Sequence, residues 1–113
     1  MQNKSFEGTA WKNAAVPASP AGYGIKIDAA SRDSHFDKSW KFVQLDLPQM
    51  AEPVIANIDK KSFWNGTCRE LINSRLGEWM ISQKLAPWPK GRPPKLLLEP
   101  IAPARFRVHL KKA

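Results

Sequence analysis

The clearest alternation of apolar and polar residues covers residues 41–47, and this pattern predicts a β-strand. Similar but shorter alternation predicts further strands over residues 25–27, 54–59, 95–99 and 104–111. Residues 48–53 begin and end with proline, so the strands on either side of them are expected to form a β-hairpin.

Apolar residues recur at helical spacing over residues 62–84, which predicts the main helix. Thr67 and Glu70 have the spacing of a capping box, in which each side chain bonds a free backbone amide, so the helix would start at Thr67. The alternative is an earlier start at Ser62, with a break or bend near Asn65 and Gly66. Pro87 ends the pattern. The apolar stripe of this helix consists of Cys68, Leu71, Ile72, Leu76, Trp79 and Met80. A shorter helix is expected over residues 32–40, with Ser31 as its N-cap.

Residues 1–24 are rich in Ala, Gly, Ser and Pro and lack periodicity, so we expect a flexible N-terminal arm followed by one domain over residues 25–113. Trp11 would either pack this arm onto the domain or contact a partner. The fold class is α+β. We expect a curved or partly closed antiparallel sheet of about five strands, packed on the long helix 62–84 and the short helix 32–40.

The composition is that of a folded protein, because 42% of the 113 residues are hydrophobic and five are Trp. No apolar run approaches the ~20 residues that cross a bilayer, and the N-terminus lacks the pattern of a signal peptide. The single Cys68 and the two histidines are too few for a disulfide or a zinc site. We therefore expect a cytoplasmic protein that does not associate with a membrane and that needs no metal or cofactor.

Positive charge is concentrated at the C-terminal end. Residues 84–113 hold eight basic residues and one acidic residue, Glu99, and so carry +7 of the net charge of +8. Such a one-sided field attracts polyanions, of which nucleic acid is the commonest.

Two segments carry these cations. The loop 85–95 contains four prolines, which predict a rigid extended conformation that would hold Trp88 ready to stack on a base. In the last strand, 104–112, alternate side chains would lie about 7 Å apart on one outward face. The predicted nucleic-acid-binding residues are Lys84, Trp88, Lys90, Arg92, Lys95, Arg105, Arg107, His109 and Lys111. The alternative is that these basic residues form a solvated face with no binding role, with Trp88 folded back as a lid on the end of the main helix.

Two other side chains have alternative interpretations. Arg75 falls within the apolar stripe, so its side chain would extend to solvent, pair with an acidic residue such as Asp46 or Glu78, or else present its guanidinium to a phosphate. Cys68 lies on the same stripe, where buried thiols are usually inert.

The sequence thus predicts a small non-enzymatic accessory or regulatory protein that binds nucleic acid, DNA rather than RNA. A second hypothesis is an interaction module or inhibitor that docks its basic face on an acidic protein. A remote third is a Mg²⁺-dependent nuclease, because Asp46 precedes an Asp59-x-Lys61 pattern across the predicted hairpin.

Overall fold

A computed structural model describes residues 4–13, 22–66 and 68–111 of the chain. This described part contains seven strands and three helices. In chain order they are β1 (Phe6–Lys12), β2 (Tyr23–Lys26), α1 (Ala29–His35), β3 (Phe42–Asp46), β4 (Val54–Asn57), α2 (Lys61–Asn65), β5 (Glu70–Ile72), α3 (Ser74–Ser82), β6 (Lys95–Ala102) and β7 (Arg105–Leu110).

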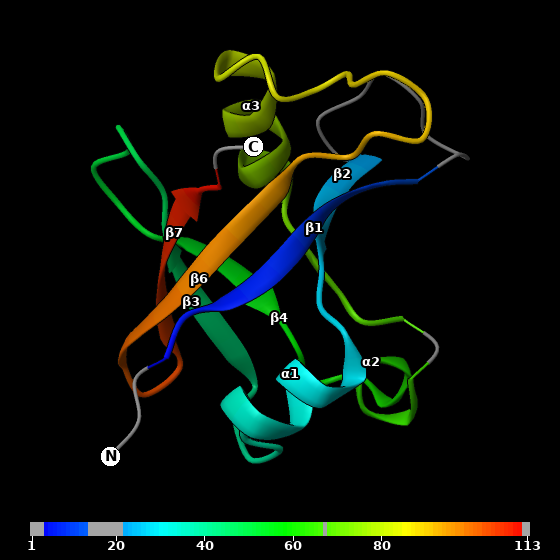
Figure 1. Cartoon of the computed structure of the whole chain (residues 1–113). Coiled ribbons are helices and arrows are strands. Elements are labelled where there is room, and N and C mark those ends of the chain that lie inside the picture. The colour runs from blue at the N-terminus through cyan, green and yellow to red at the C-terminus, as the bar shows by residue number, and fades with distance from the viewer. Residues whose placement is uncertain (1–3, 14–21, 67, 112–113) are drawn as a thin grey trace.

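All seven strands form one sheet in the order β4-β3-β7-β6-β1-β2-β5. Only β3 and β7 pair in parallel, and the other neighbours are antiparallel. The sheet curls into a nearly closed barrel, with α1 and α2 at one end and α3 at the other (Figure 1). The predicted α+β class and the curved sheet are confirmed. The strand number and the purely antiparallel pairing were wrong. None of the described helices has the length and apolar character needed to span a membrane.

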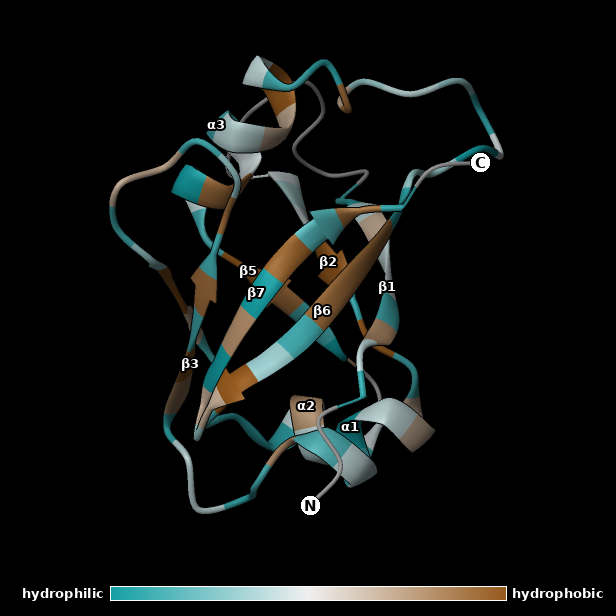
Figure 2. Cartoon of the chain, turned by 60° about the vertical axis from the view of Figure 1, so that its left-hand side comes forward, coloured by the Kyte–Doolittle hydropathy of each residue, from teal (hydrophilic) through white to brown (hydrophobic). Residues whose placement is uncertain are grey.

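The core fills the inside of this barrel. The strands supply most of its buried apolar side chains, and Figure 2 shows hydrophobic and hydrophilic residues alternating along β7. Val43 and Leu45 of β3 and Phe106 and Val108 of β7 are at most 1% exposed, as the alternation in the sequence predicts.

Strand β1 lies within the predicted N-terminal arm of residues 1–24, so that prediction was wrong for residues 6–12. It pairs with β6 on one side and β2 on the other. Phe6, Gly8 and Ala10 face the core, and Trp11 is half-exposed on the outer side. A side chain at position 8 would be too crowded, because a Cβ added to Gly8 would lie 2.6 Å from Cγ2 of Ile25. Residues 14–21 of the expected arm lie outside the described residues.

The expected helix over 62–84 is instead α2, β5 and α3. Gly66 ends α2 in the left-handed conformation with φ 94°. Residues 70–72 then pair with β2, and α3 begins after Asn73, whose side chain accepts from the Arg75 amide at 2.8 Å. Glu70 is therefore a strand residue that takes no part in a capping box, and Thr67 lies outside the described residues.

The short helix α1 begins earlier than the predicted range of 32–40. Asp28, not Ser31, is its N-cap, and the Asp28 carboxylate accepts from the Ser31 amide at 2.7 Å. This hydrogen bond stabilises the ionised carboxylate and lowers the pKa of Asp28. The helix ends at Phe36, whose backbone is extended and whose ring joins the core.

Replacing Phe6 tests whether β1 is part of the folded barrel. The Phe6 ring lies 4.3 Å from the ring of His35 and 5.5 Å from that of Phe106, and the side chain is buried. We expect Phe6→Ala to lower the free energy of unfolding by about 3–5 kcal/mol, measured by urea denaturation. Lys4→Ala, at an exposed position just before β1, should cost little. A flexible arm would instead make both changes nearly neutral.

Candidate nucleic-acid interface

The loop between α3 and β6 exposes its cations at the end of the barrel that carries α3 (Figure 1). Lys84, Lys90 and Arg92 make no ion pair with any described residue. The Arg92 amide donates to the Pro89 carbonyl at 3.0 Å, and Gly91 has φ 78°, as in a type II turn. A Cβ added at Gly91 would meet nothing within 4 Å, so this turn projects into open space.

Trp88 packs back onto the domain from this loop. Its ring is half-buried against the core, and its centroid lies 5.6 Å from that of Tyr23 in β2. The ring therefore packs on a strand residue as well as on the core. Trp88 thus helps to fix the loop against β2, and part of the indole stays exposed.

The outward residues of β7 are paired with acidic groups from neighbouring strands. Arg105 makes a bidentate ion pair with Asp46 of β3, at 2.9 and 3.0 Å. This contact raises the pKa of the Arg105 guanidinium. The two side chains lie 59 positions apart in sequence and are joined by the parallel pairing of β3 with β7.

Glu99 and Glu7 contact the other basic residues of this row. Glu99 of β6 lies directly opposite Arg107, and its Oε1 is 3.9 Å from Nη1 of Arg107 and 2.9 Å from Nε2 of His109. Lys111 donates to Oε2 of Glu7 at 2.6 Å. The expected outward orientation of Arg105, Arg107, His109 and Lys111 is confirmed, but each has an acidic neighbour across the sheet.

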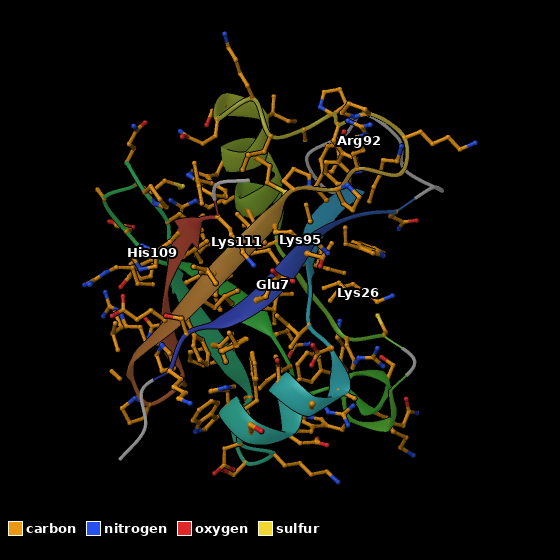
Figure 3. All side chains as sticks on the ribbon, viewed as in Figure 1. Glu7, Lys26, Arg92, Lys95, His109 and Lys111 are labelled. Atoms are coloured by element: carbon orange, nitrogen blue, oxygen red, sulfur yellow. The ribbon has the colours of Figure 1, made fainter. Side chains whose placement is uncertain are left out.

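Unpaired positive charge gathers instead around β1. Thr9 is in register with Lys26 of β2 on one side and with Lys95 of β6 on the other. Lys95 donates to the Thr9 hydroxyl at 3.1 Å, and Lys26 makes no ion pair with any described residue. Figure 3 shows these two lysines on the same side of the barrel as Arg92. We call Lys26, Lys90, Arg92 and Lys95 the basic face.

Lys26 is the member of the basic face that the sequence analysis missed. Its charge lies far from the C-terminal cluster in sequence, and only the pairing of β1 with β2 and β6 brings it close to Lys95. The alternation around Ile25 and Ile27 did indicate that Lys26 points outward.

The carboxylates of the nuclease hypothesis do not come together. Leu45 pairs with Val54 and Phe42 with Asn57, so Asp46 and Asp59 lie at opposite ends of the hairpin, on the order of 15 Å apart. Asp46 is held by Arg105, and Asp59 lies 3.8 Å from Lys41. Nowhere among residues 4–13, 22–66 and 68–111 do three or more His, Cys, Asp or Glu gather as a metal site would require.

Arg75 and Cys68 differ from their expected surroundings. Arg75 is exposed near the start of α3, as a snorkelling side chain would be, and it forms no ion pair with Asp46, Glu78 or any other described residue. Cys68 is half-buried, and its thiol donates to the Glu70 carboxylate at 2.8 Å. Both histidines make other contacts: the His35 ring stacks on the Phe6 ring, and His109 forms a hydrogen bond with the Glu99 carboxylate.

No protein-family model, curated protein or solved structure matches this chain.

Replacing Trp88 measures how firmly the loop is fixed to the domain. Because the ring is half-buried, Trp88→Ala should cost about 1–3 kcal/mol of unfolding free energy, less than a fully buried Trp would. Chemical denaturation measures this loss. Trp11→Ala is the matched control and should cost less, because Trp11 is also partly exposed but is not among the residues that pack against the buried core. Equal losses for the two variants would contradict the packing of Trp88.

Glu7 should make stability depend on acid pH. The hydrogen bond from Lys111 holds the pKa of Glu7 below its usual value of 4.5. The ionised form is therefore favoured by folding, and its contribution is complete above that value and lost as pH falls through the folded pKa. We expect Glu7→Gln to flatten the fall in Tm between about pH 6 and 2.5. Glu52→Gln, at an exposed position without an ion pair to any described residue, should leave the slope unchanged.

Proposed function

We propose that this protein binds nucleic acid, DNA in preference to RNA, through the basic face and the loop that carries Lys90 and Arg92. Its role would be that of a non-enzymatic cytoplasmic accessory or regulatory protein. The observation that carries the proposal is a group of four exposed cations on β2, β6 and the loop, none of which makes an ion pair with a described residue, although Glu70 of β5 is in register with Lys26. Unpaired cations are available to replace the counterions of a phosphate backbone.

Aromatic groups beside these cations favour nucleic acid over an acidic protein. Trp11 lies two residues beyond Thr9 on the outer side of β1 and is half-exposed. Its neighbour on β2 is Gly24, which has no side chain to cover the indole. A basic track with an accessible aromatic ring is the combination that binds unpaired strands, by contact with phosphates and stacking of bases.

The paired cations of β7 would then have a secondary role. Arg105, Arg107 and Lys111 each hold a carboxylate, and a phosphate must displace or share it. We therefore expect them to contribute less to affinity than Lys90 and Arg92 do.

A binding titration at several salt concentrations tests the proposal. Fluorescent single-stranded and duplex DNA and RNA of equal length would be titrated with the protein. If four cations meet phosphates, the logarithm of the binding constant should fall with the logarithm of salt concentration at a slope of about −3 to −4. Absence of binding at low salt would contradict the proposal. Binding only to an acidic protein would favour the interaction-module hypothesis.

Two double variants with the same loss of charge locate the surface. Lys90→Ala with Arg92→Ala should flatten the slope by nearly two units, since both cations are free. Arg105→Ala with Arg107→Ala is the matched control and should change the slope less. A larger effect of the control pair would show that β7, and not the basic face, is the contact surface.

A further inference from the structure

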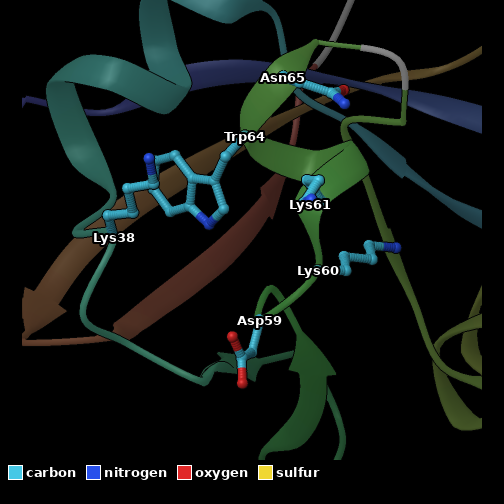
Figure 4. A pocket seen from close by; sticks show the side chains of 6 residues that line it. All are labelled: Lys38, Asp59, Lys60, Lys61, Trp64 and Asn65. Atoms are coloured by element: carbon cyan, nitrogen blue, oxygen red, sulfur yellow. The ribbon is translucent and has the colours of Figure 1, made fainter.

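A second candidate site lies at the opposite end of the barrel from the loop. A cavity of about 410 Å³ opens beside α2, after the end of β4. It is lined by Lys38, Asp59, Lys60, Lys61, Trp64 and Asn65 (Figure 4). None of these residues belongs to the basic face.

The indole of Trp64 is a fixed wall of this cavity. Its Nε1–H donates to the Ile58 carbonyl at 3.0 Å, and its ring lies 5.3 Å from that of Phe63, at 78°. The guanidinium carbon of Arg32 lies 5.8 Å from the ring centroid. Arg32 is itself buried, and its Nη1 donates to the Phe63 carbonyl at 2.9 Å. A ring held in this way loses little freedom when a second ring stacks on it.

The cavity wall carries a net positive charge. Three of the lining residues are lysines, and the single carboxylate, Asp59, lies 3.8 Å from Lys41 outside the cavity. Lys38 and Lys61 are exposed and make no ion pair with any described residue. Figure 4 shows the indole of Trp64 between these two lysines. An anion entering beside the ring would therefore meet uncompensated positive charge.

We infer that this cavity binds a nucleoside 5′-phosphate, with the base against Trp64 and the phosphate beside the ring, within the positive field of Lys38 and Lys61. A planar base matches the flat face of an indole, and lysine ammonium groups bind phosphate as point charges. The volume lies within the range of small-molecule sites. A free nucleotide and the 5′ end of a nucleic-acid strand carry the same chemistry.

NMR of the ¹⁵N-labelled full chain tests the inference, because the Trp64 indole N–H reports directly on the cavity. The probes are adenosine 5′-monophosphate, adenosine and inorganic phosphate. The nucleotide should shift the Trp64 signal, assigned by its absence in Trp64→Phe, with saturation. Adenosine and phosphate should each bind at least about tenfold more weakly, because each supplies only part of the contact. Equal binding of all three, or no saturable shift with any, would overturn the inference.

Charge reversal at exposed lysines keeps the test independent of folding. Lys38→Glu and Lys61→Glu should each weaken nucleotide binding about tenfold or more. Lys12→Glu is the matched control, because Lys12 is an exposed lysine of β1 without an ion pair to any described residue. Unchanged affinity in both cavity variants, or equal loss in the control, would also overturn the inference.

Short oligonucleotides with and without a 5′-phosphate distinguish the two sources. If the phosphorylated oligonucleotide binds more tightly than the mononucleotide, and Lys38→Glu removes this difference, the ligand is the 5′ end of a strand. Binding of the mononucleotide alone would identify a free nucleotide. The Lys90 and Arg92 double variant should leave the Trp64 response to the nucleotide unchanged, so failure of the proposed function and failure of this inference are separable.

Discussion

The insertion of β1 between β6 and β2 is the constraint on which the rest of the structure depends. In the sheet, β1 joins the pair β2 and β5 to the group β6, β7, β3 and β4. Its inward residue Phe6 packs on aromatic rings from α1 and β7, and Gly8 lets Ile25 approach where no larger side chain would fit. Without β1 the sheet could not curl into one barrel around one core.

The same insertion determines which cations are free. On the outer side of β1, Glu7 forms an ion pair with Lys111. Thr9 lies between Lys26 and Lys95, and its uncharged side chain cannot neutralise either lysine. Exposed ion pairs of this kind contribute little to stability, but they reduce the local positive potential. The number of basic residues on β7 therefore overestimates the positive potential that this strand presents to a nucleic acid.

Elements were predicted correctly where the apolar pattern matches either the helical or the strand repeat, but not both. Strands β3 and β7 alternate cleanly, and Gly91 with its flanking prolines indicated an extended loop that exposes Lys90 and Arg92. Strand β5 was missed because Leu71 and Ile72 fit a helical stripe as well as a strand, and β1 because its inward positions include the small Gly8.

The candidate sites were predictable only where they are local in sequence. The pairing of Asp46 with Arg105 and the placement of Lys26 beside Lys95 depend on strand order, which no local pattern specifies. Trp64 likewise drew attention only as a core anchor, because only the tertiary fold brings Lys38, from the segment after α1, beside α2.

Removing one carboxylate tests most directly whether cross-strand pairing limits the charge available to nucleic acid. Glu99→Gln should release Arg107 and His109, raise the affinity for DNA and make the slope against salt steeper by about one unit. Glu52→Gln changes the net charge equally but has no ion pair among the described residues, so it should have a smaller effect. An unchanged affinity and slope in Glu99→Gln, or an equal effect of the two variants, would contradict the account.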